Sequence, residues 1–277
     1  MSAAALASPT TGIADLLSPS QVSTFRDCEF RWYAKYQLGL PDQGSPSLAL
    51  GTSVDTAIKA TWHNKLDTGI DLPVTDLVDI FASTWLQESA EVEFPATKRG
   101  FAATTPEAMK DEWAVRGAKM IAEYMEKAEP SIHPRDVDLE VSGKIAGVHV
   151  RGFVDLIDIT GQVIELKTAA RTPSSISANH AFQLATYAQL APEVSPQMRV
   201  DTLVSAKAPK LVQIGHEITL PDYHYLRSSY PLVQEKMRSG LYGPNRNSWL
   251  CKRGTCPYWR QCEAEFGGIV PGGEVDE

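Results

Sequence analysis

The sequence has little of what marks membrane and secreted proteins. No apolar run among its 277 residues approaches the roughly 18 residues that a membrane-spanning helix needs. The opening segment, MSAAALASPTTGIADLL, contains no Lys or Arg and no sustained apolar stretch, so it is not typical of a secretory signal peptide. We therefore expect a cytoplasmic protein that does not associate with membranes.

The sequence also has fewer basic than acidic residues. The chain has 26 Lys and Arg against 34 Asp and Glu, which gives a formal net charge of −8 at pH 7. A net acidic chain does not indicate nucleic-acid binding by itself, so such a function must depend on a local basic patch. Hydrophobic residues make up 43% of the chain, which is enough for a sizeable core and excludes a disordered protein.

Cysteine is scarce as well, and its placement is uneven. Cys251, Cys256 and Cys262 lie near the C-terminus, separated by four and five residues, whereas Cys28 is far away in the sequence. Disulfides are rare in cytoplasmic proteins, so a cysteine cluster there favours a metal site or catalysis. Four thiolates can bind tetrahedral Zn²⁺ or a [4Fe–4S] cluster, and four unlinked buried thiols are the remaining alternative.

The order of apolar patterns predicts an α/β protein. We expect one folded domain over residues 17–266, with flexible tails at 1–16 and 267–277. The first half shows helical spacing, which predicts helices near 18–38, 48–66, 76–91 and 106–128. From Val137 onward the pattern alternates as in strands, and it is followed by a predicted helix at 180–191, strands at 199–207 and 211–220, and a helix at 222–239.

One predicted hairpin, GFVDLIDITGQVIELKTA at 152–169, carries charge within an apolar segment. A turn at 158–161 would place Asp155 on the first strand, with Glu165 and Lys167 on one face of the second. A carboxylate in a buried strand is costly unless it is paired or bound to a metal. One interpretation is a structural ion pair with Lys167. The other, which is functional, is a Mg²⁺ or Mn²⁺ site with a lysine beside it.

In its wider context the sequence resembles the PD-(D/E)XK nuclease superfamily, in its RecB-like branch. The resemblance covers about residues 16–265 and rests on LSPSQVSTFRDCEFRWYAKYQLGL, ALGTSVDTAIKA, GFVDLID…VIELKT and QLATY. It implies a restriction-endonuclease-like central mixed sheet flanked by helices, with a helical N-terminal part.

The resemblance also assigns roles to residues of the hairpin and of the following helix. The residues matching Asp155 and Glu165, with the backbone carbonyl of Leu166, bind Mg²⁺ or Mn²⁺ in the family, and the residue matching Lys167 serves the attacking water. Those matching Gln183 and Tyr187 lie beside the site and contact DNA or organise the lysine. Since they are four residues apart, they share a helix face.

The chain departs from the family at two positions of this motif set. Val154 stands where the superfamily has its name-giving Pro, a mild change that affects backbone stiffness. Asp55, in GTSVD, stands where the family usually has a metal-binding His. Asp is also a hard ligand, so we expect Asp55 to face the metal; the alternative is a solvated helix residue and the loss of one ligand.

The cysteine pattern resembles that of the iron–sulfur RecB-like nucleases, which include the AddB subunit of a helicase–nuclease, the CRISPR adaptation nucleases of the fourth Cas type and exonuclease V. This implies a [4Fe–4S] cluster on Cys28, Cys251, Cys256 and Cys262 that staples the C-terminus to the first helix. The first gap is four residues where the family usually has two. By the loop-closure estimate for a covalent link, such a tie stabilises the fold by roughly 5 kcal/mol.

A local basic channel is the predicted route for DNA. Aromatic residues beside cations, as in FRWY and YWR, suit stacking on single-stranded bases. The candidates for phosphate contact are Arg31, Lys98, Arg99, Arg171 and Lys207. Taken one by one, each of them is equally consistent with a solvated surface charge.

Together these features predict a metal-dependent DNA nuclease, an exonuclease on single strands or ends. The resemblance implies a setting in DNA repair and recombination, phage DNA processing or CRISPR adaptation, with protein partners from those systems. The first alternative is a non-catalytic DNA-binding or assembly module with a degenerate nuclease site, motivated by Asp55. The second is a zinc-stapled protein of unrelated function.

Overall fold

The computed structural model describes residues 12–42 and 44–272, and they divide into two compact units. The sheet unit, which holds the predicted hairpin, is formed by Gly44–Val141 and Phe153–Thr219. The terminal unit is formed by the described residues of 12–42, 142–152 and 220–272. Two of the four boundaries fall inside the strands β2 and β3, so each of these strands runs through both units; the other two boundaries precede Gly44 and Leu220.

Three long helices of the sheet unit begin close to where the sequence predicts them. They are α3 (Pro46–Thr68), α4 (Val74–Glu88) and α5 (Pro106–Lys127). The side chains of Ser45 and Thr105 cap α3 and α5, because each accepts a hydrogen bond from a backbone N–H in the first turn. In both helices a proline follows the cap, where its fixed φ suits the first turn.

The strands form a mixed sheet, as predicted. Neighbouring strands run in the order β3-β4-β5-β6; the β3/β4 and β5/β6 pairs are antiparallel and the β4/β5 pair is parallel, while β2 pairs with β3. Helix α6 (Ala178–Leu190) connects the parallel strands β4 and β5. The strand bounds are Pro134–Ile145 for β2, Val148–Asp158 for β3, Val163–Ala169 for β4, Gln197–Val204 for β5 and Lys210–Glu217 for β6.

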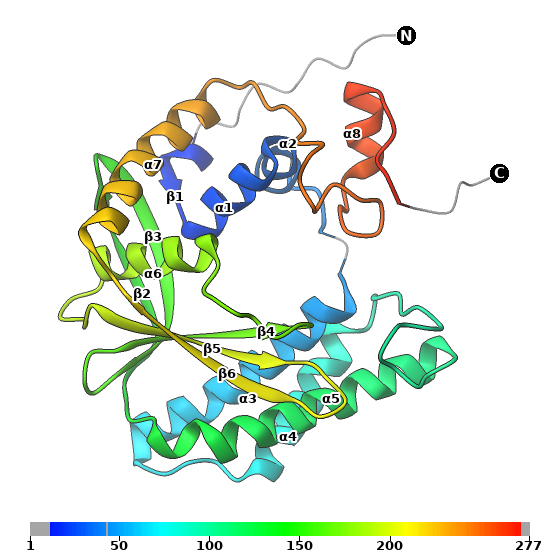
Figure 1. Cartoon of the computed structure of the whole chain (residues 1–277), viewed down its shortest axis with the longest axis vertical. Helices are drawn as coiled ribbons and strands as arrows, with labels where there is room; N and C mark the ends of the chain where they lie inside the picture. Colours follow the sequence, from blue (N-terminus) through cyan, green and yellow to red (C-terminus); the bar gives the residue numbers. More distant parts are fainter. Residues whose placement is uncertain (1–11, 43, 273–277) are drawn as a thin grey trace. The chain divides into compact units, whose positions relative to one another are not determined.

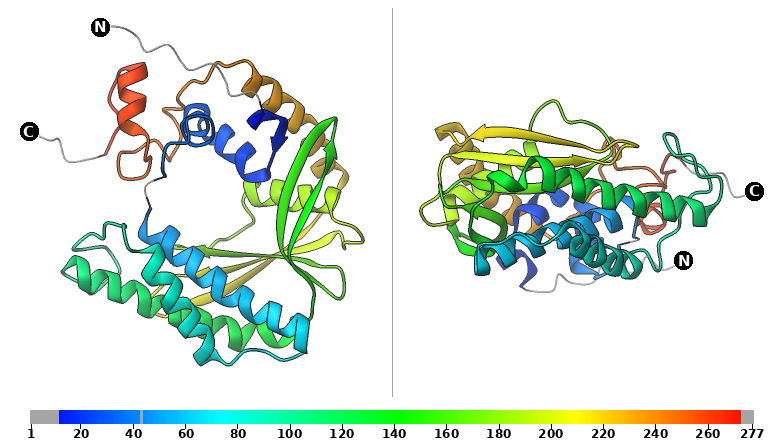
Figure 2. Two further views of the ribbon diagram at one scale, coloured as in Figure 1. Left: turned by 180° about the vertical axis from the view of Figure 1, so that it is seen from behind. Right: turned by 90° about the horizontal axis from the view of Figure 1, so that it is seen from below.

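Helices α3 to α5 lie against the strands of the sheet unit (Figure 1). The core between them is rich in large aromatic side chains. The three helices stay side by side in the further views of Figure 2. Two glycines allow close approach, one between α5 and α4 and the other between α3 and β4. A Cβ on Gly117 would lie 2.2 Å from the ring of Phe81, and a Cβ on Gly51 would lie 3.0 Å from Thr168 Oγ1 of β4. Gly51 therefore lets α3 approach the strand that carries Glu165.

The terminal unit is mainly helical and has its own aromatic core. Phe25, Trp32, Tyr33 and Tyr242 pack with ring centroids 4.8 to 6.5 Å apart. Its elements are η1 (Ile13–Asp15), β1 (Leu16–Leu17), α1 (Pro19–Asp27), α2 (Glu29–Trp32), η2 (Tyr33–Gln37), α7 (Leu220–Arg238) and α8 (Trp259–Phe266). Within the described residues, no helix is both long and apolar enough to cross a membrane.

The structure corrects the prediction of one continuous helix at 18–38. The helix is broken at Cys28, whose backbone is extended (φ −166°, ψ 117°) and which ends α1 and begins α2. Helix α8 was not predicted. Of the predicted tails, residues 1–11 and 273–277 lie outside the described residues, and Ile13–Asp15 form η1.

Candidate active site

The hairpin of β3 and β4 brings the first two acidic side chains of the site together. Leu156 on β3 pairs with Ile164 on β4, so Asp155 and Glu165 are neighbours across the two strands. The N–H of Leu166 donates a hydrogen bond of 3.0 Å to Asp155 Oδ2. This bond fixes one oxygen of Asp155 against β4 and leaves the other oriented away from that strand.

The carboxylate of Glu165 lies in the interior, and its residue is only 2% exposed. Its Oε1 atom accepts hydrogen bonds from Lys167 Nζ and from Gln183 Nε2, the latter at 2.7 Å. Its Oε2 atom is buried and has no hydrogen-bond partner among the described residues. A buried carboxylate oxygen without a partner is costly, and it is the atom at which a cation would be most stabilising.

Helix α6 supplies the two polar residues predicted from its sequence. Gln183 and Tyr187 lie one turn apart, and Gln183 Nε2 donates to Tyr187 Oη at 2.7 Å as well as to Glu165. Tyr187 Oη in turn donates to the backbone carbonyl of Phe153 at 2.5 Å. The chain of bonds runs from β3 through α6 to the carboxylate on β4, so α6 sets the orientation of Glu165.

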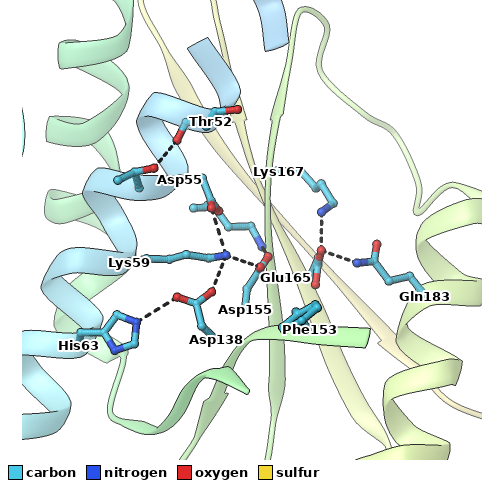
Figure 3. A network of polar contacts seen from close by, with 12 residues as sticks. Thr52, Asp55, Lys59, His63, Asp138, Phe153, Asp155, Glu165, Lys167 and Gln183 are labelled. Carbon is cyan, nitrogen blue, oxygen red and sulfur yellow. Dashed lines mark hydrogen bonds and ion pairs between the residues drawn. The ribbon is translucent and has the colours of Figure 1, made fainter. Parts of the chain in front are cut away.

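Helix α3 contributes Asp55 and, one turn later, Lys59. The Lys59 ammonium lies 3.1 Å from Asp55 Oδ2, 2.8 Å from Asp155 Oδ1 and 2.8 Å from Asp138 Oδ1 (Figure 3). His63 Nε2 lies 3.0 Å from the other oxygen of Asp138. One lysine therefore joins carboxylates from α3, β2 and β3.

The two acids at the ends of this network have raised pKa values. Burial, followed by repulsion from Asp155, raises the pKa of Glu165 to about 8, although Lys167 offsets part of the effect. Burial and the same Asp155 raise the pKa of Asp55 to about 6 against the opposing pull of Lys59. Both acids therefore hold their protons more tightly than an exposed carboxyl does, mainly because they are buried and also because Asp155 lies nearby.

The pKa values of Lys59, Lys167 and Asp138 are shifted in the direction that keeps these groups charged. Burial lowers the pKa of Lys59 and of Lys167, but the neighbouring carboxylates outweigh it and raise both. Burial raises the pKa of Asp138, and the contacts with Lys59 and His63 outweigh it and lower the pKa. The lysines are therefore cations at neutral pH.

These residues fit a hard divalent cation in their chemistry. Asp155 and Glu165 offer carboxylate oxygens, and the buried Oε2 of Glu165 has no hydrogen-bond partner among the described residues. Even so, over residues 12–42 and 44–272 no three His, Cys, Asp or Glu residues are gathered as a group that could hold a metal ion. Lys59 instead bridges Asp55 and Asp155.

The sequence-predicted catalytic and divalent-metal residues, all in the sheet unit, lie in one connected network. Figure 3 shows Asp55, Asp155, Glu165, Lys167 and Gln183 together, and Tyr187 bonds to Gln183. The backbone N–H of Leu166 takes part through its bond to Asp155. Sequence reasoning missed Lys59 and Asp138. The spacing of Lys59, four residues after Asp55, was the available signal.

The four cysteines lie in the terminal unit and line a single pocket, although Cys28 is more than two hundred residues from the others. All four are free thiols. Burial raises the pKa of Cys256, and it raises that of Cys262 to about 11. Like the carboxylates, these described cysteines are not gathered as tightly as a ligand shell.

The predicted DNA-contacting residues fall into different surroundings. Arg99, Arg171 and Lys207 are exposed on the sheet unit. Lys98 is exposed too, but its ammonium lies 4.4 Å from the centre of the Trp113 ring, and burial lowers its pKa. Arg31 belongs to the terminal unit, where it lines the cysteine pocket.

Comparison with known proteins establishes the family. A family model described as the PD-(D/E)XK nuclease superfamily matches residues 16–263, which is most of the chain. The chain belongs to the PD-(D/E)XK nuclease superfamily, whose members typically use divalent metals such as Mg²⁺. No curated protein matches the sequence.

Solved structures support the fold. A crystal structure from Eubacterium rectale, described as a "Putative exonuclease", is similar with a TM-score of 0.56 and 12% identity, covering 91% of this chain and 88% of that one. The structure of SSO0001 has a TM-score of 0.37 and 12% identity over 86% of this chain and 96% of that one, too low to carry an argument. The first similarity shows a shared fold, and the family supports a nuclease.

Proposed function

We propose that this protein is a metal-dependent DNA nuclease, an exonuclease that acts on single strands or on ends. The observation that carries the proposal is the buried pair Asp155 and Glu165, with Lys167 bonded to the second carboxylate and an oxygen of Glu165 left without a partner. Family membership supports the reaction class, and the description of the E. rectale protein as a "Putative exonuclease" supports the exonuclease that the sequence predicts.

The residues that would hold the metal are Asp155, Glu165, the backbone carbonyl of Leu166, and Asp55 in place of the family's usual His. When bound, Mg²⁺ or Mn²⁺ would polarise the scissile phosphate and make water a stronger nucleophile at neutral pH. Both carboxyls with raised pKa values must lose their protons before they can serve as ligands.

The remaining side chains position the carboxylates and stabilise charge. Lys167 is protonated at neutral pH, so we assign it to orienting water and to stabilising negative charge on the phosphate, and not to taking up a proton. Gln183 holds Glu165 Oε1, and Tyr187 holds Gln183 against β3. This arrangement limits the orientations that the Glu165 carboxylate can adopt.

The test is cleavage of end-labelled single-stranded and double-stranded DNA with Mg²⁺, with Mn²⁺ and with a chelator. The proposal predicts products that shorten progressively from an end, faster on single strands, and none with the chelator. A circular single strand should remain intact. Binding to DNA without cleavage under any metal would favour the alternative, a non-catalytic DNA-binding or assembly module.

We further propose that Cys28, Cys251, Cys256 and Cys262 bind a [4Fe–4S] cluster. What supports this is that one pocket gathers all four cysteines of the sequence, one of them at a break between two helices. Protein purified without oxygen should contain about four iron atoms per chain, and Cys28→Ser should lose both iron and thermal stability. Stoichiometric zinc without iron would support a zinc staple instead.

The basic residues and the biological setting complete the proposal. We assign Lys98, Arg99, Arg171 and Lys207 to phosphate contacts of the sheet unit, and we retain Arg31 as a contact of the terminal unit. The supporting observation is the exposure of the first four side chains. We propose DNA repair and recombination, phage DNA processing or CRISPR adaptation as the setting, with DNA as the main partner; the RecB-like resemblance of the sequence supports this choice.

A further inference from the structure

Lys59 has surroundings that an ordinary helix-surface lysine lacks. Its side chain is only 17% exposed, and its ammonium makes close contacts with three carboxylates from three separate elements. An ammonium has three N–H donors, so Asp55, Asp138 and Asp155 use its full donor capacity. The side chain is therefore held at one point beside the Asp155 carboxylate.

The partner on β2 is held in an unusual conformation. Asp138 has a left-handed backbone with φ 52°, which is uncommon for any residue other than glycine. Its carboxylate is fixed by Lys59 on one oxygen and by His63 on the other. A strained residue persists only where its surroundings over-determine it, so the position of this carboxylate beside α3 is specified by the fold.

The formal charges of the carboxylates and lysines at this site would be balanced by one divalent cation. Four carboxylates, those of Asp55, Asp138, Asp155 and Glu165, face the two ammonium groups of Lys59 and Lys167, which leaves a net formal charge of −2. Lys59 approaches Asp155 from α3, whereas Lys167 and Gln183 meet Glu165 from the other side (Figure 3). The unpartnered oxygen belongs to Glu165, the carboxylate that Lys59 does not contact.

We propose that Lys59 is a tethered cation that takes the place of a second divalent ion, so that this site binds one divalent ion per chain. The inference rests on the proposed function, because it concerns the same carboxylates. Two-ion nuclease sites place two cations on shared carboxylates to stabilise the attacking and leaving oxygens. Here the Lys59 ammonium lies 2.8 Å from Asp155 Oδ1, where it would repel a second ion.

The test counts bound Mn²⁺ by the loss of the electron paramagnetic resonance signal of the free ion. The parent protein should bind about one Mn²⁺ per chain, and so should Lys59→Arg, which keeps the charge. Lys59→Met, similar in length but neutral, should bind about two, because a net formal charge of −3 remains and Asp55, Asp138 and Asp155 lose their contacts with the ammonium. The double variant Lys59→Met/Asp138→Asn restores the net charge of −2 and should return to about one.

Several outcomes would overturn the inference. A parent that binds two ions contradicts it directly, and so does a Lys59→Met variant that binds one ion with the parent's affinity. A Lys59→Met variant that binds a single ion more than tenfold tighter would show instead that Lys59 competes with the only ion. Circular dichroism spectra of all variants check folding, and Lys59→Gln, which is also neutral and should bind about two ions, provides a second reading if Lys59→Met does not fold.

A different set of results would contradict the proposed function. A parent that binds no Mn²⁺ and cuts no DNA would remove the nuclease proposal together with the inference. A parent that cuts DNA with Mn²⁺ but binds two ions would remove only the assignment of Lys59.

Discussion

Among single residues, Glu165 is the one whose protonation ties stability to metal binding. Its pKa is raised to about 8 by burial and by Asp155. The folded chain therefore binds more protons than the unfolded chain between about pH 4.5 and 8, and linkage makes stability fall as pH rises through that window. We predict that the denaturant midpoint of the metal-free protein falls from pH 5 to pH 8, and that millimolar Mg²⁺ or Mn²⁺ restores part of the loss at pH 8.

Glu165→Gln is the matched control for this prediction. It should flatten the fall in stability that Glu165 causes up to about pH 8, since the amide does not titrate, whereas Asp55, whose pKa is raised to about 6, still titrates at lower pH. A shallower fall up to about pH 7 should persist, because burial raises the pKa of Glu129 to about 7, against the opposing effect of Lys65. A midpoint that is constant from pH 5 to 8, with and without metal, would contradict the assigned environment of Glu165.

Lys167 is predicted to affect the chemical step more than metal binding. Lys167→Ala removes a cation from the carboxylate pair, so Mn²⁺ affinity should stay the same or increase. The rate of cleavage should fall by about 10²- to 10³-fold, the usual effect of losing one charged stabiliser of a transition state. Single-turnover kinetics at saturating Mn²⁺ measure this. Equal losses of rate and Mn²⁺ affinity would show that Lys167 only supports the metal site.

Strand alternation was enough to predict which side chains of the hairpin meet. Asp155, Glu165 and Lys167 lie where a two-residue period and a turn at 158–161 place them. Asp138 was not predictable, because its left-handed backbone depends on packing against α3 and departs from the strand pattern around it. In the sequence, Lys59 has the pattern of a common surface lysine. Only the folded sheet places Asp138 and Asp155 next to it.

Among the elements, α6 acts on the site through a chain of side-chain hydrogen bonds. Tyr187→Phe removes the bonds to Gln183 and to the Phe153 carbonyl, and Gln183→Leu removes those to Tyr187 and Glu165. Because the two residues share a bond, we predict non-additive losses of stability, with a coupling of about 0.5–3 kcal/mol in a double-mutant cycle. Additive losses would mean that α6 supports the hairpin by packing alone.

The extents of the helices were mostly predictable, but the break at Cys28 was not. The caps Ser45 and Thr105, each followed by a proline, mark their helices in the sequence alone. Around Cys28 the apolar residues keep a helical period on both sides, so the pattern hides the extended residue between α1 and α2. Cys28 lines a pocket together with three cysteines that are distant in the sequence. Local periodicity does not encode such a tertiary contact.

At the scale of the whole molecule, the net charge of −8 makes DNA binding a matter of local surface. We predict that affinity for single-stranded DNA falls steeply with salt, because phosphate contacts release counterions. Arg99→Ala and Lys207→Ala should each lower the slope of log affinity against log salt by roughly one half to one. Fluorescence anisotropy measures this, and affinities that do not change with salt would exclude the basic-patch assignment.

The architecture as a whole was readable as a helical segment followed by a mixed sheet with a crossover helix. The division into two compact units was only partly readable, because two of its four boundaries fall inside β2 and β3, where the strand pattern continues; the other two precede Gly44, in a stretch with glycine, serine and proline, and Leu220. Linkers rich in glycine, proline or charge mark domain boundaries in sequence, and strands that run through two units carry no such mark.

The measurement that tests the central claim most directly is single-turnover cleavage of labelled single-stranded DNA by Asp155→Asn, at saturating Mn²⁺. Glu217→Gln, an exposed carboxylate on β6 of the same unit, is the matched control. The account predicts that Asp155→Asn loses at least about 10³-fold in rate, and that Glu217→Gln stays within about twofold of the parent. Cleavage by purified Asp155→Asn within about tenfold of the parent rate would show that the hairpin carboxylates are not the nuclease site.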